Sequence, residues 1–268
     1  MLEAPKEEIT RGIKISGDRI STIRFENVEF KYPGNENFTF KINREFKTKK
    51  VYGIVGRTGS GKTTFVKLLM GLYFPQKGRI LVDGVDLKDI SLLEWRKNIG
   101  FLPQDPFIIR STIEENIKLH MANIPHHKLI EAIKKSSLEE FINRMPNGIS
   151  TIIGERGITI SSGERERIAL ARIFLKDPPI IFLDEPTAQL DMITQKSIKD
   201  AILEWKGNKT IFIITHNFFF IDFTDEIILI ENGEITHTGS HDFLMENSLI
   251  YKEMYELHKM DSFKTHEI

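Results

Sequence analysis

The chain has 268 residues, 40% of them hydrophobic, and is long enough to bury a sizeable core. Its 37 Lys and Arg residues nearly balance its 38 Asp and Glu residues, which argues against a protein that binds nucleic acid or an anionic membrane surface through its net charge. The absence of cysteine excludes disulfides and thiolate metal sites. No apolar run approaches the roughly 18–20 residues that span a bilayer, and residues 1–10 lack the apolar stretch of a signal peptide.

The order of the expected elements predicts an α/β fold. Residues 1–22 are rich in charge and poor in apolar periodicity, as in a linker. Strands are expected at 22–32, 38–46, 51–55, 79–82, 99–102, 180–183, 210–214 and 226–230. Helical patterns lie between them at 61–72, 113–119, 128–136, 164–175 and 193–205. Short buried strands that alternate with helices predict a mainly parallel sheet, and the mostly helical stretch 93–162 predicts a helical subdomain inserted into it.

A glycine-rich loop follows the apolar run 51–55. Gly56-Arg57-Thr58-Gly59-Ser60-Gly61-Lys62-Thr63 matches the phosphate-loop pattern G-x-x-x-x-G-K-[ST], with a strand before it and a helix after it. Glycines let successive backbone amides point at a phosphate, and the helix N-terminus adds its dipole. Lys62 can reach the β- and γ-phosphates, and the Thr63 hydroxyl can bind Mg²⁺. The expected nucleotide-binding residues of this segment are Gly56, Arg57, Thr58, Gly59, Ser60, Gly61, Lys62, Thr63 and Thr64.

Two acidic residues follow the next strongly apolar run. Asp184, at the end of the strand, suits a Mg²⁺ ligand, and Glu185 beside it suits a general base that activates water. Thr215-His216 closes the following strand, which would bring an imidazole to the same edge of the sheet. By itself, a histidine in this place is more often structural than catalytic.

Residues 160–172, between the phosphate loop and the acidic pair, carry a family resemblance. Ser161-Ser162-Gly163-Glu164, followed by a basic and polar helix, resembles the signature L-S-G-G-Q of ABC transporter nucleotide-binding domains. Gln104 resembles the Q-loop glutamine, residues 188–191 the D-loop and His216 the switch histidine. Tyr32 stands where that family places an aromatic ring that stacks on adenine.

The resemblance implies a P-loop NTPase (RecA-like) core with an antiparallel β subdomain and an inserted α-helical subdomain at about 93–166. The ATP-binding domain would span 23–258, after a linker (1–22) from a missing transmembrane domain and before a tail (259–268). ATP and Mg²⁺ are the implied cofactors, with Gln104 as a further Mg²⁺ ligand and as a catalytic residue beside Glu185 and His216. Ser161 and Gly163 would meet the γ-phosphate of an ATP held by a second such domain, so that two domains enclose two ATP molecules.

Three further segments resemble exporters in particular. They are 105–117, which would touch the membrane domain, 153–157, which is similar to the exporter x-loop, and 239–244 with Tyr251, which is similar to the exporter tail. The expected function is therefore ATP hydrolysis that drives export, at the cytoplasmic face of the cell membrane. The expected partner is a transmembrane domain, and no nucleic-acid partner is expected. The alternatives are a soluble ABC ATPase of translation or DNA repair, and a degenerate nucleotide binder that does not hydrolyse.

The signature departs from the family pattern at two positions. Ser162 replaces the first glycine and adds a side chain where the backbone must approach a phosphate. Glu164 replaces the glutamine and brings a carboxylate close to an anionic ligand. In the D-loop, Ala188 and Gln189 replace the usual Ser and Ala. These changes bear on the rate of a site built with this signature and leave Lys62, Asp184, Glu185 and His216 untouched.

Overall fold

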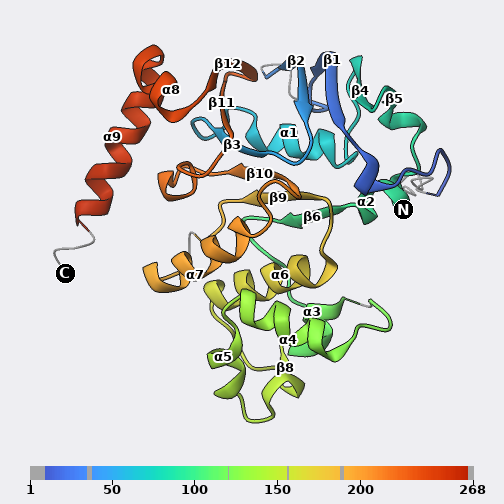
Figure 1. The fold of residues 1–268 in the computed structure, drawn as a ribbon, viewed down its shortest axis with the longest axis vertical. Coiled ribbons are helices and arrows are strands. Elements are labelled where there is room, and N and C mark those ends of the chain that lie inside the picture. Colours follow the sequence, from blue (N-terminus) through green and yellow to red (C-terminus); the bar gives the residue numbers. More distant parts are fainter. Residues whose placement is uncertain (1–9, 35–37, 120, 156, 188–189, 265–268) are drawn as a thin grey trace.

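The computed structural model describes residues 10–34, 38–119, 121–155, 157–187 and 190–264. Strands and helices alternate along most of the chain, as in an α/β fold (Figure 1). The strands are β1 (Thr22–Phe30), β2 (Phe40–Lys47), β3 (Val51–Val55), β4 (Lys77–Val82), β5 (Val85–Asp86), β6 (Ile99–Leu102), β7 (Ser111–Thr112), β8 (Ile152–Ile153), β9 (Ile180–Asp184), β10 (Thr210–Ile214), β11 (Glu226–Glu231) and β12 (Glu234–Gly239). The α-helices are α1 (Lys62–Leu69), α2 (Leu92–Lys97), α3 (Ile113–Lys118), α4 (His126–Lys135), α5 (Glu139–Asn143), α6 (Ser162–Lys176), α7 (Met192–Leu203), α8 (His241–Asn247) and α9 (Leu249–Lys264). Short 3₁₀ turns are η1 (Gly17–Arg19), η2 (Leu87–Asp89), η3 (Gly148–Ser150) and η4 (Phe218–Phe220).

One ten-stranded sheet forms the body of the molecule, in the order β5-β4-β1-β2-β12-β11-β3-β10-β9-β6. β3 lies parallel to β10 and β11, and β9 lies parallel to β10 and β6. β1, β2, β4 and β5 pair antiparallel and form the other half. Both the parallel core and the antiparallel subdomain expected from the sequence are thus present as parts of a single sheet.

Aromatic packing fixes α1 between the two halves of the sheet. The ring of Phe65 on α1 stacks on Phe25 of β1 at 5.3 Å between centroids and meets Phe212 of β10 at 5.5 Å. At its other end, α1 stops before Gly71, which has a φ of 65°. The Trp95 indole of α2 donates to the carbonyl of Leu69 at 2.7 Å and so satisfies one orphan group of that helix end. The helix that begins at Lys62 is therefore held at both ends.

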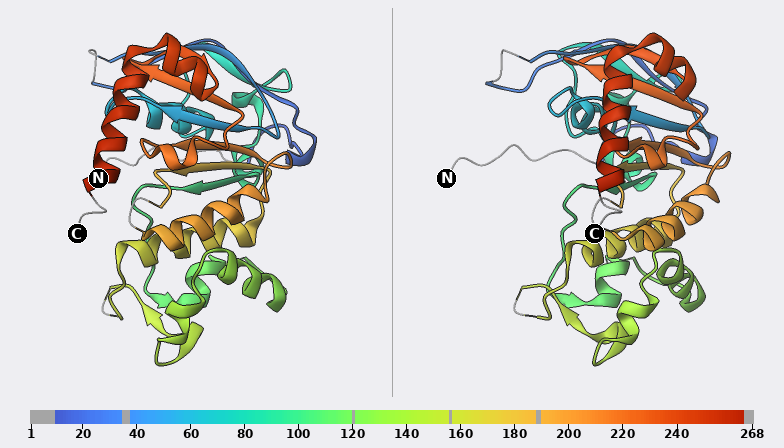
Figure 2. Two further views of the ribbon diagram at one scale, coloured as in Figure 1. Left: turned by 60° about the vertical axis from the view of Figure 1, so that its left-hand side comes forward. Right: turned by 90° about the vertical axis from the view of Figure 1, so that its left-hand side faces the viewer.

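The helical subdomain lies below the sheet (Figures 1 and 2). It begins after β6, and not near residue 93, because β6 pairs with β9 and belongs to the main sheet. α6 is shared by two apolar cores. Ala169, Leu170 and Ile173 pack towards the sheet, and Ile168 and Ala171 pack towards α3, α4 and α5.

The two ends of the described chain pack on this body. The backbone of Ile13 exchanges hydrogen bonds with Asp89 and Ser91, and the amide of Gly17 donates to the Asn98 side chain at 3.1 Å. α9 runs past residue 258 to Lys264 along one side of the molecule (Figure 2). Within the described residues, no helix is both long and apolar enough to cross a bilayer.

Candidate functional site

Four loops meet at one edge of the parallel part of the sheet. β3 leads into the glycine-rich loop, β10 into Thr215 and His216, β9 into Asp184 and Glu185, and β6 towards Gln104. The strands β3, β10, β9 and β6 are consecutive neighbours and run parallel, so their carboxyl ends lie side by side. This edge is where open α/β sheets bind ligands.

The glycine-rich loop is shaped by backbone that only glycine adopts without strain. Gly56, Gly59 and Gly61 have φ values of 153°, 80° and 114°. A side chain at Gly56 would also clash with the carbonyl oxygen of Ile230. The Lys62 ammonium curls back and donates to the carbonyls of Gly56 at 2.6 Å and Arg57 at 3.1 Å. The loop thus forms a closed cradle with a cation at its mouth.

The chemistry of this cradle fits a phosphate with a magnesium ion. The Ser60 hydroxyl is buried and has no hydrogen-bond partner within the described part of the chain. Thr63 offers a hydroxyl and Asp184 a carboxylate, which are oxygen donors of the kind Mg²⁺ prefers alongside phosphate oxygens. No cluster of three or more His, Asp or Glu side chains able to hold a metal occurs among the described residues.

A cavity of about 370 Å³ opens beside this cradle. Its lining is Tyr32, Phe38, Gly59, Gly61, Lys62, Thr63 and Thr64. The Tyr32 hydroxyl lies 3.2 Å from the Thr64 hydroxyl, and the Tyr32 ring meets the ring of Phe30 edge-on at 4.9 Å. Phe38 was not predicted as a site residue. No motif includes this position, and an aromatic residue close to a strand is usually part of the hydrophobic core.

Asp184 and Glu185 stand in different environments although they are adjacent. Burial at the end of β9 and, after it, the charge of Glu185 together raise the pKa of Asp184 to about 6, and the charges of Lys62 and Lys67 oppose the shift. Burial also lowers the pKa of Lys62, and the two carboxylates oppose that shift. Glu185 has a φ of 54°, and its amide donates to the carbonyl of Ile214 at 2.8 Å. This conformation is sparsely populated by non-glycine residues, and such positions cluster at functional sites.

The structure brings Glu185 and His216 into direct contact. The distance from His216 Nδ1 to Glu185 Oε1 is 2.7 Å, and the side chains are 70% and 10% exposed, respectively. Because an ionised carboxylate only accepts, Nδ1 carries the proton and donates it to this bond. The hydrogen bond to Glu185 raises the pKa of His216. The contact depends on the parallel register of β9 and β10, which pairs Asp184 with Ile214.

Gln104 follows β6 and is exposed at the same edge. The segment after it reaches the junction with the helical subdomain, where Phe107 is 60% exposed. The guanidinium carbon of Arg172 on α6 lies 4.8 Å from the centroid of the Phe107 ring. The same side chain donates from Nε to the carbonyl of Asn116 at 2.7 Å. An exposed aromatic ring held by a fixed cation is suited to contact another surface.

The signature residues form the N-terminus of α6. The Ser161 hydroxyl accepts from the Glu164 amide at 3.2 Å, and the Glu164 carboxylate accepts from the Ser161 amide at 2.7 Å. This reciprocal pair is a capping box. Glu164 therefore turns back onto its own helix end, and Gly163 is buried behind it. Ala188 and Gln189 of the D-loop and Arg156 of the x-loop lie outside the described residues.

One contact joins this helix to the acidic loop and was missed in the sequence. The buried Glu166 carboxylate accepts a hydrogen bond from the amide of Thr187, two residues after Glu185. Thr187 itself has a φ of 70°. Glu166 stands in the charged run Glu164-Arg165-Glu166-Arg167, so nothing in the sequence set it apart, and its partner lies 21 residues away in the chain.

Comparisons with known proteins agree on one family. The family model described as ABC transporter matches residues 39–188. The chain is 40% identical over 238 residues to the protein named iron-sulfur clusters transporter ATM1, mitochondrial, of Kluyveromyces lactis, covering 88% of this chain and 33% of that protein. It is 36% identical over 261 residues to the ATP-dependent lipid A-core flippase of Escherichia coli, covering 96% and 44%. The solved structure of a bacterial Atm1-family ABC exporter with ATP bound is similar with a TM-score of 0.83 and 30% identity, covering 92% of this chain and 43% of that one.

Proposed function

This chain belongs to the ABC transporter family, and from that premise we propose that it hydrolyses Mg-ATP to power export across a membrane. The observation that carries the proposal is the Glu185–His216 pair, which stands beside the Lys62 cradle at the carboxyl edge of the sheet. A carboxylate, an imidazole and a phosphate cradle together suit phosphoryl transfer to water. Relatives named as transporters and flippases support the exporter class and do not favour a soluble ATPase of translation or DNA repair.

Each side chain at this edge has one role in the proposal. Lys62 and the loop amides bind the phosphates, and Thr63 and Asp184, with Gln104 beyond β6, would hold Mg²⁺. A bound Mg²⁺ neutralises charge that develops on the terminal phosphate oxygens. Glu185 accepts the proton of the attacking water at its carboxylate. His216, held by Glu185 through Nδ1, presents Nε2 to the terminal phosphate.

The aromatic wall of the cavity would bind the base. Tyr32 is fixed by its hydrogen bond to Thr64 and by the Phe30 ring, so little side-chain entropy would be lost when a base stacks on it. Arg57, Thr58 and Ser60 complete the loop around the phosphates. The tolerance of stacking for different bases leaves the preference for adenine to the surroundings of the ring.

The partners we propose are a second ABC ATP-binding domain and a transmembrane domain. The chain spans only about a third to just under half of the relatives it matches. The remainder of an exporter would supply the membrane-spanning part, placing this domain at the cytoplasmic face of the membrane. Ser161 and Gly163 at the N-terminus of α6 would meet the γ-phosphate of ATP bound to the second domain.

The test is Glu185→Gln, which removes the base and keeps the shape of the side chain. We expect ATP to bind and turnover to fall by at least about a hundredfold. An ATP-dependent dimer should then accumulate and elute earlier in size-exclusion chromatography. Glu246→Gln, an exposed glutamate on α8, is the matched control and should behave as the parent. Parental hydrolysis by Glu185→Gln would mean that another group is the base.

The dimer itself has a separate test. The parental ATPase rate per chain should rise with protein concentration, because each complete site would take residues from two chains. A rate per chain that stays constant over a wide concentration range would remove the shared-site mechanism and leave a site within one chain.

A further inference from the structure

The C-terminal helix α9 lies against the edge of the sheet that carries the phosphate chemistry. It runs from Leu249 to Lys264 along one side of the body, outside the segment 39–188 that the family model matches (Figures 1 and 2). Three kinds of contact join it to the two loops that follow β3 and β10.

The first contact is a shared apolar cluster. Tyr251 of α9 is fully buried and packs with Val55, the last residue of β3, and with Phe218, two residues after His216. The rings of Tyr251 and Tyr255 meet Phe218 edge-on at 5.4 and 5.1 Å. The bases of both loops thus rest on one face of α9.

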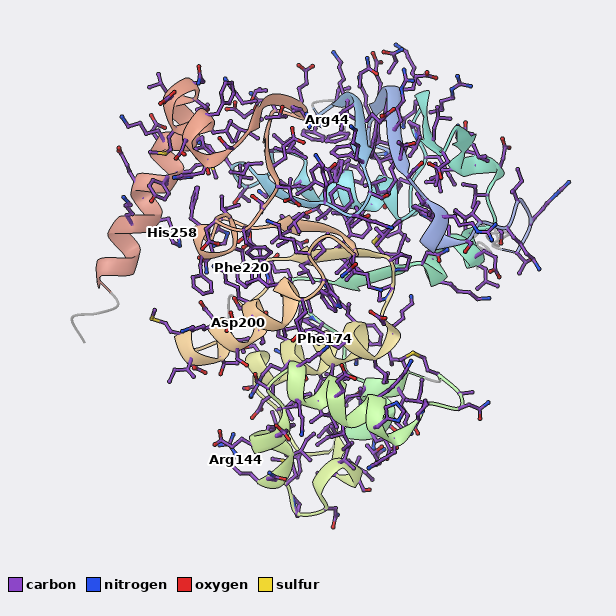
Figure 3. The ribbon with its side chains drawn as sticks, in the orientation of Figure 1. Arg44, Arg144, Phe174, Asp200, Phe220 and His258 are labelled. Atoms are coloured by element: carbon purple, nitrogen blue, oxygen red, sulfur yellow. The ribbon has the colours of Figure 1, made fainter. Side chains whose placement is uncertain are left out.

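The second contact is a hydrogen bond to the residue next to His216. Nε2 of His258 lies 3.0 Å from Oδ1 of Asn217, and the same oxygen accepts from the Phe219 amide at 2.9 Å. An amide oxygen only accepts, so His258 is the donor. The backbone N–H of Asn217 in turn donates to the Thr215 hydroxyl at 2.8 Å. Figure 3 shows His258 between α9 and the segment that carries Phe220.

The third contact reaches the phosphate loop. Glu253 of α9 pairs with Arg57 at 3.0 Å, and the Arg57 carbonyl accepts from the Lys62 ammonium at 3.1 Å. Both partners of the ion pair are well exposed, so the pair contributes little binding energy and is sensitive to salt. The bond from His258 is the better shielded of the two polar contacts, because the His258 ring also packs on Phe218 at 5.4 Å.

We propose that α9 is a positioning element for the γ-phosphate end of the site. Through His258 it holds the Thr215–Phe218 turn, which carries the exposed imidazole of His216. The imidazole itself contacts Glu185. The exposed ion pair of α9 to Arg57 adds a weak, salt-dependent contact to the phosphate loop. His216 acts on the terminal phosphate after ATP is bound, so loss of the α9 contact lowers kcat and leaves KM for ATP largely unchanged. This inference rests on the proposed function of His216.

The experiment compares His258→Leu with His258→Gln in the full chain. Gln keeps an N–H donor close to the place of Nε2, and Leu fills the space without one. We expect His258→Leu to lower kcat by about three- to tenfold with KM within about twofold of the parent, and His258→Gln to recover most of kcat. Glu253→Gln should raise KM for ATP by about twofold at low salt and have no effect at high salt. Glu256→Gln on the exposed face of the same helix is its matched control.

Amide hydrogen exchange across residues 215–220 gives a readout independent of turnover. Exchange should quicken in His258→Leu and stay parental in His258→Gln. Equal kcat in parent and His258→Leu, or equal losses in both His258 variants with a common drop in Tm, would overturn the positioning role. If Glu253→Gln and Glu256→Gln have the same KM for ATP at low salt, the contact to the phosphate loop has no role in ATP binding. A parent chain that binds ATP without hydrolysing it would contradict the proposed function, and the exchange comparison would still decide the role of α9.

Discussion

Asp184→Asn should make the nucleotide-free protein more stable at neutral and alkaline pH. The folded state raises the pKa of Asp184 from 3.8 to about 6, first through burial and then through Glu185. A raised carboxyl pKa means that the folded state holds the proton more tightly than the unfolded state. Stability is therefore lost as the pH rises from about 4 towards 6, and the loss is complete above that window. A shift of about two units corresponds to ~3 kcal/mol, and partial contact with water reduces this to ~2 kcal/mol.

The assay is chemical unfolding in EDTA without nucleotide, between pH 5 and pH 8. We expect Asp184→Asn to gain ~2 kcal/mol at pH 8, and the gain to shrink towards pH 5, where the parental carboxyl is largely protonated. Asp191→Asn is the matched control with the opposite sign. Hydrogen bonds from the backbone and side chain of Thr194 lower the pKa of Asp191, so its loss should destabilise at pH 8. An Asp184→Asn protein no more stable than the parent at pH 8 would refute the reasoning.

Three further predictions concern turnover and binding. Lys62→Ala removes the cation at the mouth of the cradle and should weaken ATP binding at least about tenfold; unchanged affinity by equilibrium titration would contradict the phosphate-loop assignment. His216→Ala should lower kcat by about ten- to a hundredfold and spare ATP binding, which single-turnover assays can separate; an unchanged kcat would leave the imidazole a structural role. Ser162→Gly with Glu164→Gln keeps the capping box, since Gln serves at that position, and removes a negative charge where an anion would approach. It should strengthen ATP-driven dimerisation and raise the ATPase rate; a rate equal to or below the parent would mean that the departures are neutral or adaptive.

Apolar runs were enough to place the parallel core. The predicted strands at 51–55 and 210–214 coincide with β3 and β10, since a strand buried on both faces leaves an unbroken apolar signal. The predicted ends of helices and strands were less accurate where a single backbone conformation sets the end of the element. The helix expected at 61–72 stops at Leu69 because Gly71 takes a left-handed conformation, and the strand expected from 38 begins at Phe40.

Elements without an apolar pattern could not be predicted. β12 reads Glu-Ile-Thr-His-Thr-Gly and pairs antiparallel with β11, with a single parallel pairing to β2, a partner that no local signal specifies. At the candidate site, motifs predicted Lys62, Asp184, Glu185 and His216 one by one. The contact between Glu185 and His216, and the turn of Glu164 onto Ser161, depend on strand register and side-chain direction, which spacing along the chain does not encode.

The contacts of α6 explain why the signature and the acidic loop should act as one body. Its first turn is closed by the Ser161–Glu164 capping box, and one turn later Glu166 holds the amide of Thr187. The loop that carries Glu185 in a strained conformation is therefore tied to the same helix whose N-terminus would face a second domain. One turn of helix and the Glu166–Thr187 hydrogen bond therefore link that N-terminus to the loop of Glu185, so that a shift of the helix end would be felt two residues from the carboxylate.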